Sequence, residues 1–176
     1  MPTERKSVPI HAPRLPGRIV EGMRAAIADP KSRPQAYIRL SASGGVRGEA
    51  YDFEYRIDAA GRSSVRLRDE LKERRAARRA SEPKTKAQPA RFAALARELD
   101  IETLLRSETP SGGFPPDSVV GRLEVSDGEQ TVTFLFLADD AQAARARMPA
   151  PEALRKAVDA VYRAAATHLD IKDVRP

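Results

Sequence analysis

The stretch from Val119 to Phe136, VVGRLEVSDGEQTVTFLF, decides the fold class. Apolar and polar residues alternate on both sides of Asp127-Gly128, which is the pattern of two half-buried strands joined by a tight turn. Asp-Gly is a favoured sequence for a two-residue type I′ turn. Such a turn places Leu123 opposite Val132. The stretch therefore predicts an antiparallel β-hairpin with one apolar face.

Downstream of the hairpin, the sequence predicts the strongest helix of the chain. Pro151 followed by Glu152 is a favourable helix start. From there, apolar residues recur with the period of a helix that buries one face: Leu154, Val158, Val161, Tyr162, Ala165 and Leu169. Because the hairpin and this helix each offer one apolar face, we expect them to pack together in the core.

Upstream of the hairpin, the sequence predicts three further strands. Residues 36–40 and 50–57 alternate apolar and polar side chains with the two-residue period of a half-buried strand. Asp58-Ala59-Ala60-Gly61 supplies a turn, and residues 64–68 form the next strand. These strands add to the hairpin and extend the predicted sheet.

Helices and a linker are predicted between these strands and the hairpin. Residues 69–80 have high helix propensity, but beyond Leu71 they hold no large apolar residue, so this helix has little to bury. Residues 81–89 contain two prolines and two lysines and are predicted to be a linker. The next helix is interrupted near Asp100 and buries one stripe: Phe92, Leu95, Ala96 and Leu99.

Runs of strands with helices between them predict an α+β fold. We expect a two-layer sandwich, in which an antiparallel sheet of four to five strands carries helices on one face. The length of 176 residues suits one domain with extensions. We assign residues 35–169 to this domain, with a basic, flexible segment at 69–90. Residues 1–34 are a basic, proline-rich arm with a short helix from Gly17, and residues 170–176 are a tail.

Composition excludes several classes of protein. The chain contains no cysteine, so it has no disulfide framework and no thiolate metal site. No run approaches the about 20 apolar residues of a membrane span. The first residues, MPTERK, lack the apolar core of a signal peptide. We therefore expect a cytoplasmic protein with no membrane partner.

Motifs for catalysis, metals and cofactors are missing. Neither His11 nor His168 lies in a pattern typical of a base or a ligand, and no zinc-protease, nucleophile-elbow, P-loop or dinucleotide motif occurs. Ser43-Gly44-Gly45 indicates a turn or bulge, because no helix follows it to hold a phosphate. Asp139-Asp140 indicates a helix cap more than a pair of metal ligands. We expect no catalytic residue, metal or cofactor, although a carboxylate-only hydrolase stays open.

Positive charge is concentrated in two segments. The net charge of +6 includes +5 from residues 1–40 and +7 from residues 62–91, while the rest of the chain is net acidic. One interpretation is that these segments contact nucleic acid phosphates or an acidic protein. The alternative is that they form only a solvent-exposed helix face and a flexible tail. No aromatic residue lies between Gly61 and Arg91, so base stacking is not expected. The candidate basic surface comprises Arg68, Lys72, Arg74, Arg75, Arg78, Arg79, Lys84 and Lys86.

A succession of short motifs runs through most of the chain. They are Ile38-Arg39-Leu40 with Ser43-Gly44-Gly45, Leu99-Asp100-Ile101, Pro116-Asp117, Leu123-Glu124-Val125, Val132-Thr133-Phe134, and Pro151 with Leu154. Their order resembles the emfourin family of small bacterial inhibitors of protealysin and related thermolysin-like metalloproteases. The resemblance spans roughly residues 35–169.

The resemblance implies a non-catalytic protein that restrains a partner protease by inserting a loop into its active cleft. The candidate loop is 107–117, and its candidate binding residues are Gly112, Gly113, Phe114, Pro115 and Pro116. An exposed aromatic residue on a proline-stiffened loop loses little entropy on binding. The alternative for Phe114 is that its ring folds back as a core plug. The alternative function is an accessory or nucleic-acid-associated protein that acts through residues 1–34 and 62–91.

Overall fold

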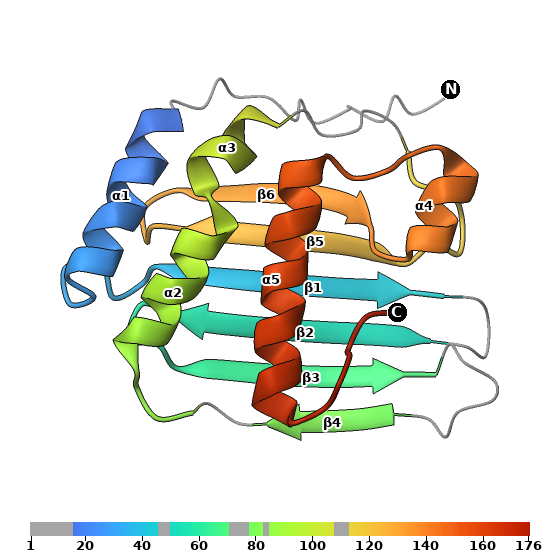
Figure 1. The fold of residues 1–176 in the computed structure, drawn as a ribbon, viewed down its shortest axis with the longest axis horizontal. Coiled ribbons are helices and arrows are strands. Elements are labelled where there is room, and N and C mark those ends of the chain that lie inside the picture. Colours follow the sequence, from blue (N-terminus) through green and yellow to red (C-terminus); the bar gives the residue numbers. More distant parts are fainter. Residues whose placement is uncertain (1–15, 46–49, 71–77, 83–84, 108–112) are drawn as a thin grey trace, which may run out of the picture.

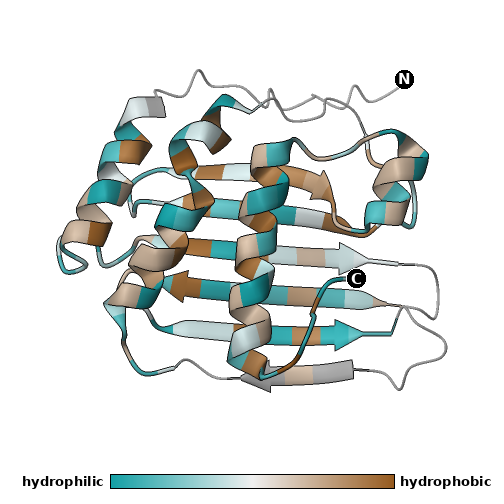
Figure 2. Ribbon diagram, viewed as in Figure 1, coloured by the Kyte–Doolittle hydropathy of each residue, from teal (hydrophilic) through white to brown (hydrophobic). Residues whose placement is uncertain are grey.

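Alternation of apolar and polar residues along most of the strands builds the sheet at the centre of the fold (Figures 1 and 2). The computed structural model describes residues 16–45, 50–70, 78–82, 85–107 and 113–176. The strands are β1 (Tyr37–Gly44), β2 (Tyr51–Asp58), β3 (Ser63–Asp69), β4 (Arg78–Glu82), β5 (Val120–Ser126) and β6 (Thr131–Leu137). They form one antiparallel sheet in the order β4-β3-β2-β1-β5-β6.

Helices cover one face of this sheet. They are α1 (Pro16–Ala28), α2 (Pro89–Leu99), α3 (Ile101–Arg106), α4 (Asp140–Ala146) and α5 (Glu152–Leu169). Figure 1 shows α2, α3 and α5 in front of the strands, with α4 beside the end of β6. The expected α+β fold, a sheet layer under a helix layer, is confirmed. Within the described part of the chain, no helix is long and apolar enough to cross a membrane.

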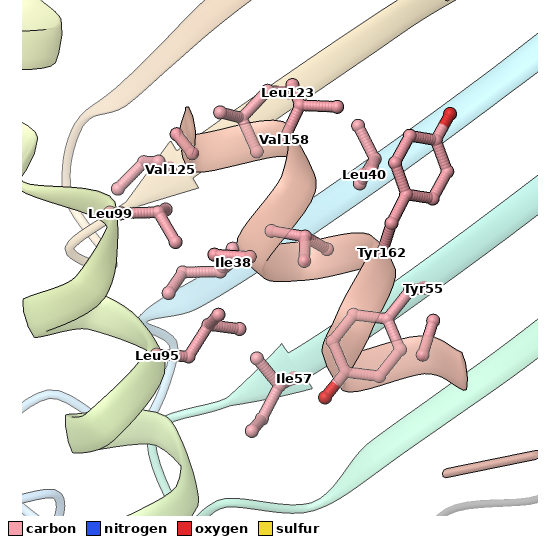
Figure 3. Close-up of a cluster of buried hydrophobic side chains, with 14 of the residues drawn as sticks. Ile38, Leu40, Tyr55, Ile57, Leu95, Leu99, Leu123, Val125, Val158 and Tyr162 are labelled. Atoms are coloured by element: carbon pink, nitrogen blue, oxygen red, sulfur yellow. The ribbon is translucent and has the colours of Figure 1, made fainter. Parts of the chain in front are cut away.

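The core lies between the sheet and the helices α2 and α5. Figure 3 shows side chains of β1, β2 and β5 meeting those of both helices. The residues expected to pack together from the hairpin and the last helix are all at most 6% exposed: Leu123, Val132, Phe134, Val158, Val161 and Tyr162. The burial of this set confirms that the hairpin and α5 share one core.

The predicted break in the helix after Leu99 is confirmed. Asp100 adopts the left-handed conformation, with φ of +47°, and so ends α2. Its side chain also caps α3, because it accepts a hydrogen bond from the Thr103 N–H at 3.4 Å. Ile101 and Leu104 of α3 then turn into the core.

The predicted helix over residues 69–80 is wrong where the structure describes it. Asp69 ends β3, and residues 78–82 form β4, which pairs with β3 so that Asp69 lies opposite Arg78. The free edge of β3 offers a row of backbone partners, and pairing with it outweighs the helix propensity of this arginine- and alanine-rich segment. This strand raises the sheet to six strands from the expected four to five. Residues 71–77 lie outside the described residues.

The predicted hairpin exists, but its register differs by two residues. Leu123 pairs with Phe134 rather than with Val132, and Ser126 pairs with Thr131. The connection is therefore four residues long, because the buried Asp127 carboxylate accepts hydrogen bonds from the Glu129 and Gln130 N–H groups at 2.8 and 2.7 Å. This side-chain turn replaces the two-residue type I′ turn.

The short helix in the segment 1–34 packs against the domain. Ile19, Met23 and Ala26 of α1 are buried in the core. Gly22 lies against the hairpin turn, where a Cβ atom would come within 1.9 Å of the Asp127 Oδ2 atom. The helix therefore fixes the turn from one side. Residues 1–15 lie outside the described residues.

A substitution in the hairpin tests this core. Phe134→Ala should lower the free energy of unfolding by about 3–5 kcal/mol, because Phe134 is 5% exposed and removal of its ring leaves a cavity in the apolar core. Leu135→Ala is the matched control, since Leu135 on the opposite face is 39% exposed and should cost less than about 1 kcal/mol. Denaturant unfolding of both variants gives the comparison; equal losses would contradict the assigned core.

Candidate functional site

Two motifs that lie far apart in the sequence meet at the end of the sheet where β1 stops and β5 starts. Ser43 of β1 pairs with Val120 of β5. The next residue, Gly44, has φ of +144°, and a Cβ atom there would lie 2.1 Å from the Ser118 carbonyl oxygen. Only glycine fits this approach without a backbone shift. The Ser43-Gly44-Gly45 motif therefore supports the segment that enters β5.

Hydrogen bonds fix the loop that precedes β5, which we call the Gly113–Ser118 loop. The Ser118 hydroxyl donates to the Pro115 carbonyl oxygen at 2.6 Å, which closes a short turn. Asp117 lies inside this turn and adopts φ of +58°. A proline pair and a left-handed residue together restrict the backbone to few conformations.

Helix α4 fastens the same loop from outside through Gln142. Its amide oxygen accepts a hydrogen bond from the Val119 N–H at 2.9 Å, and its amide nitrogen donates to the Asp117 carbonyl oxygen at 3.4 Å. Gln142 is held in turn by the helix cap, because the Asp139 carboxylate accepts from the Ala141 and Gln142 N–H groups. Asp139 thus acts as the helix cap that the sequence indicated. The loop, α4 and the end of β1 form one connected unit.

The loop presents most of its predicted binding residues to solvent. Gly113, Pro115 and Pro116 are exposed and Phe114 is partly exposed, whereas Gly112 lies outside the described residues. Phe114 belongs neither to the core cluster nor to the partly buried residues packed against it. The structure therefore gives no support to the alternative that Phe114 is a core plug.

Beside the loop, α4, α5 and the C-terminal segment enclose a polar cleft of about 660 Å³. Arg175 lines it and pairs with Asp173 at 3.1 Å and Asp159 at 3.6 Å. The segment 170–176 is anchored here, because the buried Tyr51 hydroxyl donates to the Val174 carbonyl oxygen at 2.5 Å. Arg175 thus pairs with two of the four aspartates that line this cleft.

The structure describes only part of the candidate basic surface, and the described residues differ in their surroundings. Arg68 donates two hydrogen bonds of 3.1 Å to Glu70, which raise the pKa of the guanidinium. Arg78 and Arg79 belong to β4, and Lys86 is exposed. Lys72, Arg74, Arg75 and Lys84 lie outside the described residues. The described residues thus include most of the loop but only half of the candidate basic surface.

One polar cluster escaped the sequence analysis. His168, which shows no motif, lies with its Nδ1 atom 2.9 Å from the Ser63 hydroxyl oxygen. The two residues are 105 positions apart, so no local spacing could reveal the contact. Among the described residues, no group of three or more histidine or carboxylate side chains is placed to hold a metal ion.

Comparisons with known proteins leave the family open. No family model matches the sequence, and no curated protein shows significant similarity to it.

Removal of the Gln142 side chain tests whether α4 holds the loop. Gln142→Ala leaves the Val119 N–H without its partner, and this should lower the free energy of unfolding by about 1–3 kcal/mol. Hydrogen exchange of the Val119 amide should accelerate at the same time. The control is Gln130→Ala, because Gln130 acts through its backbone N–H rather than its side chain. Unchanged exchange at Val119 would show that the clamp does not hold the loop.

Proposed function

We propose that this protein is a non-catalytic binding module that engages a partner protein through the Gly113–Ser118 loop. The observation that carries the proposal is the combination of a fixed backbone with exposed side chains. Gln142 and Gly44 hold the loop from two sides, while Pro115 and Pro116 remain exposed. A loop that is ordered before binding loses less conformational entropy on association, so more of its contact energy appears as affinity.

The more specific proposal is that the partner is a thermolysin-like metalloprotease and that the module inhibits it. The motifs on which the emfourin resemblance rests include Ser43-Gly44-Gly45 and Pro116-Asp117, and these two build and support the loop. Phe114 would then be the apolar anchor that enters the protease cleft. The chain contains no cysteine, so neither its fold nor the proposed binding depends on a disulfide bond or on an oxidising compartment. The proposal therefore includes a cytoplasmic location.

The alternative partner is a nucleic acid or an acidic protein bound by the basic segments. Its support is the charge of +7 within residues 62–91, part of which lies on the edge strand β4. Against it, Arg68 pairs with Glu70, and Arg66 lies 3.4 Å from Asp52. Guanidinium groups already paired with carboxylates contribute little to phosphate binding. We therefore rank the loop first.

Two variants separate these functions. Phe114→Ala should weaken binding to a thermolysin-like protease by roughly thirtyfold, because loss of a central apolar anchor costs about 2 kcal/mol or more. Charge reversal at Arg74, Arg75, Arg78 and Arg79 should change this affinity little. Titrations against the protease, with inhibition of peptide hydrolysis as a second measurement, check both results; thermal melting confirms that each variant folds.

The same variants titrated against a short duplex DNA test the alternative. If the basic segments bind phosphates, the fourfold reversal abolishes DNA binding, Phe114→Ala has no effect, and each lost contact lowers the salt slope by about 0.9. That ranking would contradict the proposed loop function. A wild-type chain that binds neither the protease nor DNA at micromolar concentration would contradict both.

A further inference from the structure

A second cavity lies at the opposite end of the sheet from the Gly113–Ser118 loop. It opens between α2, α5 and the turn that joins β2 to β3, and its volume is about 510 Å³. This volume falls within the range of small-molecule sites, which is roughly 300–1,000 Å³. Among the described residues, its lining includes none from the Gly113–Ser118 loop or from the candidate basic surface.

Most of this cavity is apolar. Ile57 from β2, Leu95 from α2, and Ala160 and Ala164 from α5 form its walls. Figure 3 shows Ile57 and Leu95 facing each other beside Tyr55 at this end of the core. An apolar body of a few carbon atoms would gain burial here without displacing any charged group.

One wall of the cavity is a cluster of hydroxyl and imidazole groups centred on Ser63. Ser63 is only 2% exposed, and its hydroxyl oxygen lies 2.9 Å from the His168 Nδ1 atom and 3.4 Å from the Thr85 hydroxyl oxygen. The backbones of Ser63 and Thr85 are also joined, since the Thr85 N–H donates to the Ser63 carbonyl oxygen at 3.0 Å. The Tyr55 hydroxyl, on a ring that is 3% exposed, completes the cluster. Polar groups that converge on one wall of an apolar cavity orient a ligand.

The charge at the rim indicates which ligand fits. Arg163 is paired with Glu98, so these two charges offset each other. Arg91 at the start of α2 forms no ion pair with any described residue. Burial raises the pKa of the Tyr55 hydroxyl. Arg91 lies close enough that its positive charge partly opposes this rise. The described residues that line the cavity therefore carry one positive charge in excess, that of Arg91.

We propose that this cavity binds a small carboxylic acid with an apolar body. The carboxylate is held by Arg91 and by the hydroxyl and imidazole groups around Ser63, while the hydrocarbon part lies against Ile57 and Leu95. A carboxylate is favoured over a neutral ligand because it pairs with the Arg91 guanidinium and accepts hydrogen bonds from several donors at once. This site is independent of the proposed loop function, and each can fail without the other.

Octanoate is a suitable probe, because it combines one carboxylate with an unbranched apolar chain. With about ten non-hydrogen atoms it should bind with a dissociation constant in the millimolar range or below. In a titration of the full, nitrogen-15-labelled chain, the amide signals of Ser63, Thr85 and Leu95 should shift and saturate. Octanamide has the same shape without the charge and should bind at least about tenfold more weakly, since a charge-assisted hydrogen bond is lost.

Two arginine variants on the same helix test whether Arg91 supplies the positive charge that pairs with the ligand carboxylate. Arg91→Gln should raise the dissociation constant of octanoate by about tenfold or more. Arg97→Gln, an exposed position on α2 that does not line this cavity, should change it by less than about twofold. Ser63→Ala should weaken octanoate binding, but by less than Arg91→Gln.

Three results would overturn the proposal. They are the absence of saturable shifts at up to about 50 mM octanoate, equal binding of octanamide and octanoate, and equal effects of Arg91→Gln and Arg97→Gln. The amide spectrum of each variant shows whether it is folded, so a folded variant with an unchanged affinity counts directly against the assigned contact.

Discussion

The pairing of β1 with β5 is the constraint on which the rest of the structure depends. β1 and β2 follow each other in the sequence, but β5 lies about 80 residues downstream, and its pairing with β1 joins the two parts of the sheet. On the open face, Arg39 spans this junction, with its Nε atom 3.1 Å from the Glu54 carboxylate on β2 and its Nη1 atom 3.2 Å from the Glu124 carboxylate on β5. The hydrogen bond to Glu54 and the nearby charges of both carboxylates raise the pKa of Arg39.

This junction also sets the positions of both candidate sites. Because β1 and β5 are antiparallel, the end of one strand lies beside the start of the other, and Gly44 meets the Ser118 backbone there. The Gly113–Ser118 loop is therefore held by the sheet itself and by Gln142 of α4. At the other end of the sheet, residues at the ends of β2 and β3 line the second cavity together with α2 and α5.

Local sequence patterns predicted the elements that are stabilised by neighbouring residues. They failed where contacts with residues distant in the sequence determine the conformation. The stripe of Phe92, Leu95 and Leu99 and the break at Asp100 could be read from the sequence, because helix periodicity and capping act within a few residues. The segment 78–82 could not be predicted in this way, because its strand conformation comes from pairing with the edge of β3 rather than from its own propensity.

The hairpin register was misjudged by two residues, since the Asp127 side chain builds a longer turn than Asp-Gly alone suggests. Residues 113–118 were expected to lie in a loop and do so. The support of this loop by Gly44 and Gln142, and the contact of Ser63 with His168, depend on tertiary structure and could not be read from local patterns.

Hydrogen exchange of the whole chain, alone and with saturating amounts of a catalytically inactive thermolysin-like protease, tests whether the Gly113–Ser118 loop binds a partner. We expect slower exchange at the amides of Phe114, Asp117 and Ser118 and at Gly44 and Gly45, with no change along β4. Because the loop backbone is already fixed in the free protein, the rest of the sheet should exchange at the same rate in both samples. Protection confined to β4, or no protection anywhere, would contradict the claim that the Gly113–Ser118 loop is the partner-binding surface.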